Sequence, residues 1–339
     1  MERRGSEDSW RRLRLFRSDF LGVTEAGDLH SLFASALHQA EQQFRAARTV
    51  GYESRPLNLF YGLSQAGRAV AAVASLRGAT PVELNGHGIK CTNLGDFRMG
   101  RVPHLANLKV RSEDSTRASF PVLSRILQSQ ELRTPTTLAR LWEMLVEPQL
   151  HEPLTTPQAP VLLVEQESLL GPEGSGTGFL QLSGIPASID FSDPANFTQF
   201  SLLYPSLVGT NFDRVTGQSR GYDSRPAAQS IQVLRTVPAS LNGTISTYRG
   251  SPVALPSPPA GDRSMHPLMI WWAILYGLSM LARYEPTSWT KLIDVNASPS
   301  AVPIEFLLDI ALESIVDILA DTIGELLSEI PQTVIPGVE

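Results

Sequence analysis

The chain has 339 residues, 42% of them hydrophobic, and a formal net charge of −6. This length and apolar content allow one large core or two modest ones and exclude disorder over most of the chain. The negative charge argues against indiscriminate nucleic-acid binding, and the single cysteine, Cys91, excludes an internal disulfide and a cysteine-based metal cage. A nucleophilic Cys91 would need a partner that the sequence does not place, so we interpret it as a buried, inert thiol.

The charge is unevenly distributed along the chain. Residues 1–150 carry 20 Lys and Arg against 15 Asp and Glu, a balance of +5. Residues 151–200 carry six acidic residues, residues 301–339 carry eight, and neither range has a basic one. Any nucleic acid would therefore bind the N-terminal part. The first 16 residues contain no apolar run of signal-peptide length, so we expect a cytoplasmic protein.

The first half of the chain predicts a helical hairpin. Residues 25–49 place apolar side chains at helical spacing, which indicates an amphipathic helix. Pro56 marks the start of a second predicted helix, 57–77, which ends before Gly78. A short loop between two helices is typical of an αα-hairpin.

An irregular segment, residues 78–120, follows this hairpin, because Gly, Asn, Pro and single charges interrupt every apolar run. The expected elements from here to residue 147 are short strands near 81–84 and 105–111 and helices at 119–130 and 135–147. Thr134 and Pro135 are expected to be the N-cap and first residue of the last of these helices.

The middle of the chain changes in composition. Residues 151–262 are rich in Pro, Gly, Ser and Thr, and they contain short apolar or alternating runs that predict strands at 159–166, 178–185 and 230–237. The Pro-rich run 251–262 ends this segment as a linker or ordered loop.

Two helices are expected near the end of the chain. The first runs from Pro267 to 284, before Pro286, and its first 16 residues carry no charge. A membrane-spanning helix needs about 20 such residues, so a buried core helix is expected and no membrane partner. The second covers 304–329.

Acidic residues recur every four positions along the last helix. They are Glu305, Asp309, Glu313, Asp317, Asp321, Glu325 and Glu329. A spacing of four residues advances about 40° beyond one full turn, so this stripe winds around the helix axis. Two interpretations stay open: a solvated edge, or a docking surface for the basic N-terminal region or for a partner.

The sequence Tyr-Gly-Leu-Ser-x-x-x-Arg occurs twice, in "LFYGLSQAGRA" and in "ILYGLSMLARY", and both copies fall in predicted helices. Each copy places Tyr, Ser and Arg on one helix face. These candidate ligand-binding or anion-binding residues are Tyr61, Ser64, Arg68, Tyr276, Ser279 and Arg283. A cation and two hydroxyl groups on one face suit a phosphate or carboxylate. In the alternative, structural interpretation, Tyr and Arg satisfy buried carbonyls and Ser bonds to its own helix.

Gly62 and Gly277, inside the two copies, are poor helix formers and indicate the close approach of a neighbouring backbone.

A further candidate is His87 in "LNGHGIKC", where two glycines flank the imidazole and Lys90 follows. Such a loop can expose a catalytic or ligand-binding histidine, although a structural role is the alternative. We identify no metal-binding, zinc-protease, nucleophile-elbow or phosphate-loop motif and expect no metal or cofactor. Asp190, Asp193 and Asp213 could serve a hydrolase, but acidic loop residues are usually solvated.

These observations predict an α+β fold, mainly α, in which N- and C-terminal helices form one helical core with a β-rich insertion between them. The expected parts are an N-terminal helical part (1–150), the β-rich insertion (151–262) and the C-terminal helices (263–339) that complete the core. The two similar helices predict a pseudo-symmetric bundle and a possible homodimer.

Four segments follow one another along the chain: "QAEQQFRAA", "RPLNLFYGLSQAGRAV", "GHGIK" and "HPLMIWWAILYGLSMLARYEPTSW". In these segments the chain resembles the YaaC-like proteins, a bacterial family with no established activity. This resemblance implies the family's organisation and no reaction.

The helical hairpin followed by a histidine is also similar to the HEPN superfamily of all-α domains, common in toxin and phage-defence proteins. That resemblance implies metal-independent RNA cleavage by an Arg and a nearby His. Arg68 and His87 would fill these roles, but 18 residues separate them. Arg98 and His104 fit the usual spacing, but Gly100 and Pro103 between them make a continuous helix improbable.

Two functions follow as hypotheses. The first is a non-catalytic binding or assembly protein that recognises a small anionic ligand. The alternative is a HEPN-like ribonuclease, with RNA as partner, Arg68 as phosphate clamp and His87 as acid or base.

Overall fold

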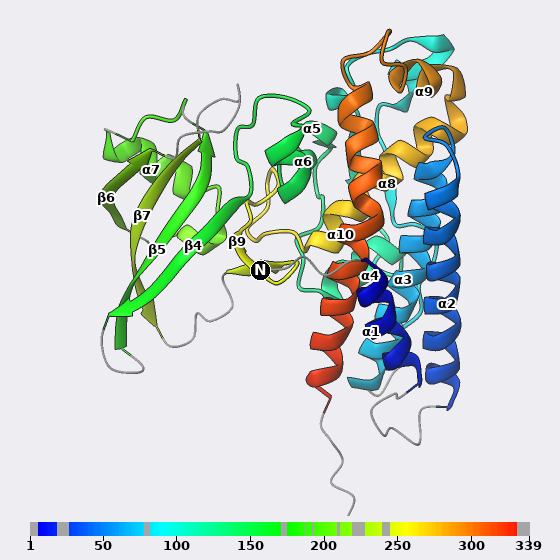
Figure 1. Ribbon diagram of the computed structural model, residues 1–339, viewed down its shortest axis with the longest axis horizontal. Helices are drawn as coiled ribbons and strands as arrows, with labels where there is room; N and C mark the ends of the chain where they lie inside the picture. Colours follow the sequence, from blue (N-terminus) through cyan, green and yellow to red (C-terminus); the bar gives the residue numbers. More distant parts are fainter. Residues whose placement is uncertain are drawn as a thin grey trace, which may run out of the picture.

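The computed structural model describes residues 6–18, 27–77, 82–170, 175–186, 188–191, 193–208, 211–218, 228–238 and 245–330. Its long helices stand side by side in one body, and the larger sheet lies beside them (Figure 1). Helices from both ends of the chain build the helical body, and the strands of the larger sheet come from the segment between them. The predicted fold class, a helical core with a β-rich insertion, is confirmed. The boundaries at 150 and 262 stay a prediction.

The predicted hairpin consists of α2 (Gly27–Thr49) and α3 (Arg55–Arg77), each within two residues of the expected bounds. Helix α2 turns its apolar stripe, which includes Phe33, Leu37 and Phe44, into the core. A Cβ atom on Gly62 would lie 2.8 Å from the Phe44 ring, so this glycine lets the two helices pack closely. The close neighbour is a side chain and not the backbone that we expected.

The segment after the hairpin differs from its prediction. Its first strand is β1 (Ile89–Cys91), and residues 82–84 form none. Residues expected to begin a second strand form a 3₁₀ turn, η2 (Leu105–Asn107), ahead of β2 (Lys109–Ser112). A further 3₁₀ segment, η1 (Leu94–Gly100), lies between β1 and η2.

The expected helix at 135–147 is interrupted. Thr136 and Thr137 form β3, which pairs with β2, so a helix cannot begin before residue 138. The N-cap is therefore Thr137, whose side chain accepts from the Arg140 amide, and not Thr134. The helices of this region are α4 (Ser119–Ile126), α5 (Leu138–Trp142) and α6 (Val146–His151).

The larger sheet is antiparallel, with strand order β6-β7-β5-β4-β9-β8. Its strands are β4 (Leu162–Leu170), β5 (Ser175–Pro186), β6 (Asn211–Gln218), β7 (Ala228–Pro238), β8 (Ser246–Tyr248) and β9 (Ser251–Ala254). Helix α7 (Pro194–Ser201) and the 3₁₀ turn η3 (Pro205–Leu207) follow β5. Phe197 and Tyr204 from this stretch pack with Leu182 and Ile231 of the sheet in a hydrophobic core of their own. The β-rich segment thus packs around a hydrophobic core that is separate from the core of the helical body.

Helix α8 (Pro267–Tyr284) runs through the middle of the helical body and is buried along most of its length, as predicted. Residues 271–274, four consecutive positions that point to successive sides of the helix, are at most 1% exposed. Pro286 begins a new short helix, α9 (Pro286–Leu292), and α10 (Ala301–Ser328) follows. In the described part of the chain, no helix combines the length and apolar character needed to cross a membrane.

The acidic side chains of α10 contact different elements along the length of the helix, because the stripe winds around its axis. Asp309 accepts a hydrogen bond from Tyr52 (3.0 Å), near the start of α3. Asp321 forms an ion pair with Arg12 (2.6 Å) on α1 (Ser6–Ser18), a helix that we did not predict. The stripe thus contacts α1 at Asp317 and Asp321, while Glu313 and Glu325 are exposed, as on a solvated edge.

A buried ionic network joins α10 to the β8–β9 turn and to α6. Arg249 donates to Asp317 of α10 (2.8 Å) and to Glu147 of α6 (2.5 Å). Ser9 of α1 also donates to Asp317 (2.6 Å), and Tyr248 donates to Glu147 (2.7 Å). The three charged side chains are 7–11% exposed, so each depends on the others for compensation.

We predict that acid destabilises the protein through His266, the N-cap of α8. Its Nδ1 accepts from the Leu268 amide (3.2 Å), and burial lowers the pKa of the imidazole to about 4. Because the unfolded chain takes up this proton near pH 6.5, stability is lost as the pH falls from about 6.5 towards 4, by up to roughly 3 kcal/mol.

The test is urea unfolding of the wild type and of His266→Asn between pH 4 and 8. Asparagine keeps a side-chain acceptor at the N-cap but does not titrate. The variant should lose less stability than the wild type over this range. Parallel pH profiles for the two proteins would contradict the prediction.

Candidate functional site

The two YGLS copies lie on α3 and α8, which run in opposite directions where they pack. Phe60 near the start of α3 contacts Tyr276 and Trp272 of α8, with ring centroids 5.5 and 5.7 Å apart. Further along α3, Gly67 approaches the Trp272 ring so closely that a Cβ atom would lie 2.8 Å from it. The antiparallel packing therefore brings the Tyr of the first copy to the Arg of the second.

Arg283 donates a hydrogen bond to the Tyr61 hydroxyl (3.1 Å) at the C-terminal end of α8. Its guanidinium also lies over the Tyr284 ring, 5.1 Å from the centroid. In the described part of the chain the guanidinium of Arg283 contacts these two tyrosines, and it forms no ion pair with a carboxylate. Both Arg283 and Tyr61 are exposed, so the remaining guanidinium donors face solvent.

His87 joins the same cluster from the loop before β1. Its ring lies 5.1 Å from Phe60 and 5.9 Å from Tyr276. The loop is fixed to the start of α4, since the His87 carbonyl accepts from the Phe120 amide (3.2 Å). Gly88 has a φ of +74°, and a Cβ atom there would lie 2.5 Å from the same amide nitrogen, so only glycine fits.

The electrostatic surroundings keep His87 neutral at pH 7. Partial burial lowers its pKa first, the positive charge of Arg283 lowers it further, and Glu113 opposes both effects. The ordinary value is near 6.5, so the folded imidazole has a free lone pair at neutral pH. The positive charge of Arg283 therefore acts on a neutral acceptor.

The second copy contributes differently from the first. Tyr276 is 6% exposed, and burial raises the pKa of its hydroxyl. Ser279 donates to the Tyr276 carbonyl of its own helix (2.8 Å), which is the structural role we considered for it. A two-fold arrangement would pair Tyr276 with Arg68 as Tyr61 pairs with Arg283, and the ring contacts of Tyr276 are instead with Phe60 and His87. The pseudo-symmetric bundle and the homodimer stay predictions.

The pairing of Arg68 with His87 that the ribonuclease hypothesis requires stays a prediction. Arg68 is exposed on α3, seven residues and about 10 Å of helix beyond Tyr61, whereas His87 contacts the helix at Phe60. Ser64 is half-buried between them on the same helix, and Lys90 is exposed on β1.

Gly277 fits a packing role. A Cβ atom on it would lie 3.2 Å from the Leu108 side chain and 3.4 Å from that of Leu138. As for Gly62, the close neighbours are side chains and not the expected backbone.

Two residues of the cluster were not predicted. Phe60 holds the rings of His87 and Tyr276, and Glu113 acts on the pKa of His87. Phe60 stands next to Tyr61 in the sequence, but its central position depends on the helix crossing. Glu113 follows β2, and its amide donates to the Gly88 carbonyl (2.9 Å), a pairing across 25 residues that no local pattern reveals.

The other candidates are not supported as sites. His104 caps η2 by accepting from the Ala106 amide (3.2 Å), and η1 is kinked at Arg98 and Met99, so Arg98 and His104 share no helix. Asp193 caps α7, and the side chain of Asp213 lies outside the described residues. Cys91 is half-buried, and burial raises its thiol pKa to about 12, so the thiolate is rare at neutral pH.

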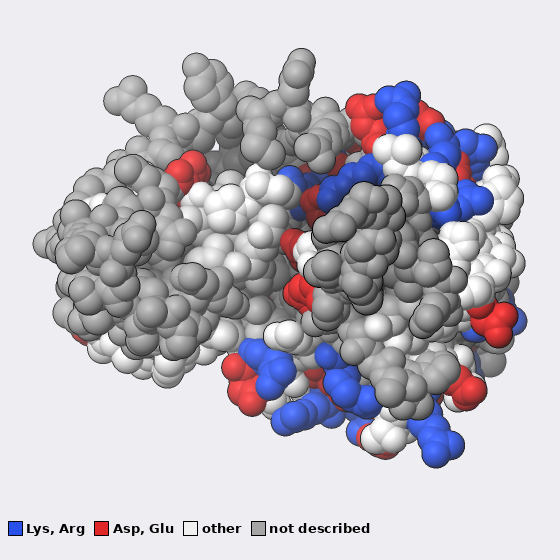
Figure 2. Space-filling model, turned by 90° about the horizontal axis from the view of Figure 1, so that it is seen from below, with Lys and Arg blue, Asp and Glu red and all other residues white. Residues whose placement is uncertain are grey.

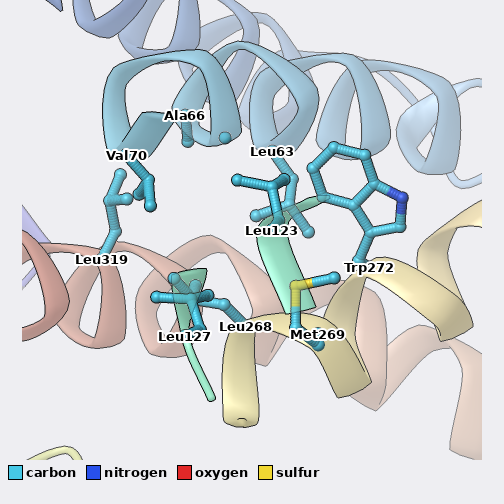
Figure 3. Close-up of a pocket in the computed structure, with 10 residues that line it drawn as sticks. Leu63, Ala66, Val70, Leu123, Leu127, Leu268, Met269, Trp272 and Leu319 are labelled. Carbon is cyan, nitrogen blue, oxygen red and sulfur yellow. The ribbon is translucent and has the colours of Figure 1, made fainter. Parts of the chain in front are cut away.

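A small cavity lies between α3, α4, α8 and α10, with Leu63, Leu123, Trp272 and Leu319 among its lining residues (Figure 3). Its volume is about 10 Å³, and every labelled lining residue is apolar. One water molecule would barely fit and would find no polar partner, so this is a packing defect.

Comparisons with known proteins agree with the resemblance seen in the sequence. The family model described as YaaC-like Protein matches residues 23–323, which include α2 to α9 and most of α10. No curated protein and no solved structure matches the chain. The HEPN resemblance receives no support from these comparisons. The chain belongs to the YaaC-like protein family.

Proposed function

We propose that this chain is a binding protein that recognises an anionic ligand at the C-terminal end of α8. The observation that carries the proposal is the exposed guanidinium of Arg283, which the Tyr61 hydroxyl orients (3.1 Å) and whose recorded partners in the described residues include no carboxylate. Arginine in this condition suits phosphate or carboxylate, because its planar donors bind two oxygens at once.

The surroundings of Arg283 favour a ligand over a purely structural role. The charge of Arg283 acts on His87, whose loop is fixed by backbone hydrogen bonds. The rings of Phe60 and Tyr276 contact the imidazole. A site held on helices and on an ordered loop loses little entropy when a ligand binds. Lys90, exposed on the strand after this loop, adds positive charge nearby in the sequence.

We predict that Arg283→Gln weakens the binding of inorganic pyrophosphate about tenfold or more, because a charge-assisted hydrogen bond is worth about 1.5–3 kcal/mol. Isothermal titration calorimetry at pH 7.5 measures the effect. Arg68→Gln is the matched control: it removes the same charge from the equivalent position of the other YGLS copy. Weaker binding in Arg68→Gln with unchanged binding in Arg283→Gln would contradict the proposed site.

We predict that an anion raises the pKa of His87. The free protein should show an imidazole pKa below 6.5, for the reasons given above. Sulfate, whose charge is constant between pH 5 and 8, should raise this pKa and bind more tightly as the pH falls. NMR titration of the imidazole protons, assigned by their loss in His87→Gln, measures both effects. An unchanged His87 pKa in sulfate would place the anion elsewhere.

A HEPN-like, metal-independent ribonuclease is the second candidate function. It is favoured by the effect of Arg283 on the His87 pKa, because a neutral imidazole beside a guanidinium can accept a ribose hydroxyl proton while the cation holds the phosphate. Arg283 would then replace Arg68 as the clamp.

This candidate predicts RNA cleavage in EDTA and a loss of about 10²–10⁴-fold in His87→Gln, since that is the usual contribution of a general acid or base. Gel analysis of a labelled RNA measures the rate. Cleavage that survives in His87→Gln would come from a different site or a contaminant.

A further inference from the structure

A continuous set of contacts leads from Arg283 to the loop around Met99. Glu285, two residues after Arg283, lies 3.7 Å from the guanidinium of Arg98 in η1. On the next helix, Ser288 donates to the Phe97 carbonyl and Lys291 donates to the Gly100 carbonyl (3.0 Å). The loop is therefore fixed against the same end of the helical body as the anion site, the end with α9 in Figure 1.

This loop holds an apolar side chain in solvent. Met99 is 95% exposed and has a φ of +57°, a conformation that costs a non-glycine residue roughly 1 kcal/mol or more. Phe97 and Leu105, on either side of the loop, are 0% exposed and anchor it. An anchored loop that holds a strained, exposed Met is typical of a contact surface.

Exposed cationic side chains lie along the same set of contacts, from Arg283 to the Met99 loop. Arg98 has a side chain that is 72% exposed, and Arg101, Lys291 and Arg283 are exposed as well. The carboxylate next to Arg98, that of Glu285, is only 16% exposed, so Arg98 faces solvent more than its ion-pair partner does.

Exposed aromatic rings accompany these cations. Tyr284 is 53% exposed and Tyr61 is 38% exposed. On the opposite side, Figure 2 shows acidic and basic side chains next to one another in small groups.

Resting on the proposed anion site, we propose that its ligand is a single-stranded nucleic acid, which runs from Arg283 along Arg98 to Arg101 and Lys291. Cations that track a backbone beside rings on which bases can stack are the usual means of binding single strands. A small anion would need Arg283 and would leave the exposed loop cations and Met99 without a role. An acidic protein would use the cations but would gain less from the exposed rings.

Fluorescence anisotropy with a labelled oligouridine of about ten nucleotides, a length typical of one single-strand site, tests the proposal. The double variant Arg98→Gln/Arg101→Gln should bind this RNA about tenfold or more weakly. Its salt dependence, the slope of log K against log salt, should fall by about 1.4, because each phosphate contact on a single strand contributes about 0.7. Tyr284→Ala should also weaken RNA binding, by about tenfold.

The matched control is Arg11→Gln/Arg263→Gln, which removes two exposed arginines from α1 and from the loop before α8. It should bind RNA like the wild type. Pyrophosphate binding should be unchanged in both double variants, since neither touches Arg283.

The outcomes separate the two proposals. If pyrophosphate binds through Arg283 while the loop variants leave RNA binding unchanged, the nucleic-acid path is overturned and the anion site stands. If neither pyrophosphate nor RNA binds the wild type, both fall. Equal affinity for a duplex of the same sequence, or displacement of RNA by a polyglutamate peptide at equal charge, would also overturn the assignment to a single strand.

Discussion

Helix α8 presents apolar side chains around its whole circumference, so it is stable in water only where other elements cover every side of it. Trp271, Trp272, Ala273 and Ile274 follow one another at steps of about 100° around the axis, and all four are at most 1% exposed. Helices α3, α4, α5 and α10 and the strands β1 and β2 all pack against it. Burying one such aromatic or aliphatic side chain contributes about 1.5–3 kcal/mol. The enclosure of α8 therefore determines where the other helices lie, and polar chemistry can occur only at its two ends.

The two ends of α8 have different polar contacts. At the N-terminal end His266 caps the helix with a neutral ring nitrogen. At the C-terminal end the partial negative charge of the helix favours a cation, so Arg283 is stabilised there without a carboxylate. This explains how a guanidinium can be held by a tyrosine hydroxyl and an aromatic ring and still have donors for a ligand. An anion would then bind on the outer side of the guanidinium, away from the helix end.

The long helices could be predicted from the sequence because periodicity averages over many residues. The apolar stripe of α2, the uncharged run of α8 and the acidic stripe of α10 each gave bounds within a few residues. The segment between Pro81 and His151 could not be predicted as well, because its elements are short and depend on distant partners. Thr136 is an example: its pairing with Val110 moves the helix start to residue 138.

The site could be predicted only in part, for a related reason. The helical spacing identified Tyr61 and Arg283 as side chains with ligand chemistry, and the glycines around His87 indicated its special loop. No local pattern shows that α3 and α8 pack in opposite directions, which brings Tyr61 of the first copy to Arg283 of the second. The opposite charges of the first and last parts of the chain likewise indicated that these parts could contact each other. Which residues pair could not be predicted, because the ion pair between Arg12 and Asp321 depends on how α1 packs.

The buried ions explain why the β-rich segment is firmly attached to the helical body. Arg140 donates to the carbonyls of Ala159 and Ser257 (both 3.0 Å), where the chain leaves and returns, and Glu143 accepts from the Ala159 amide (3.2 Å). Arg249 joins the β8–β9 turn to α6 and α10 in the same way. Buried ion pairs add little net stability, but they disfavour every arrangement that leaves a charge without its partner. These ions thus fix the attachment, while the apolar contacts of α8 supply most of the stability.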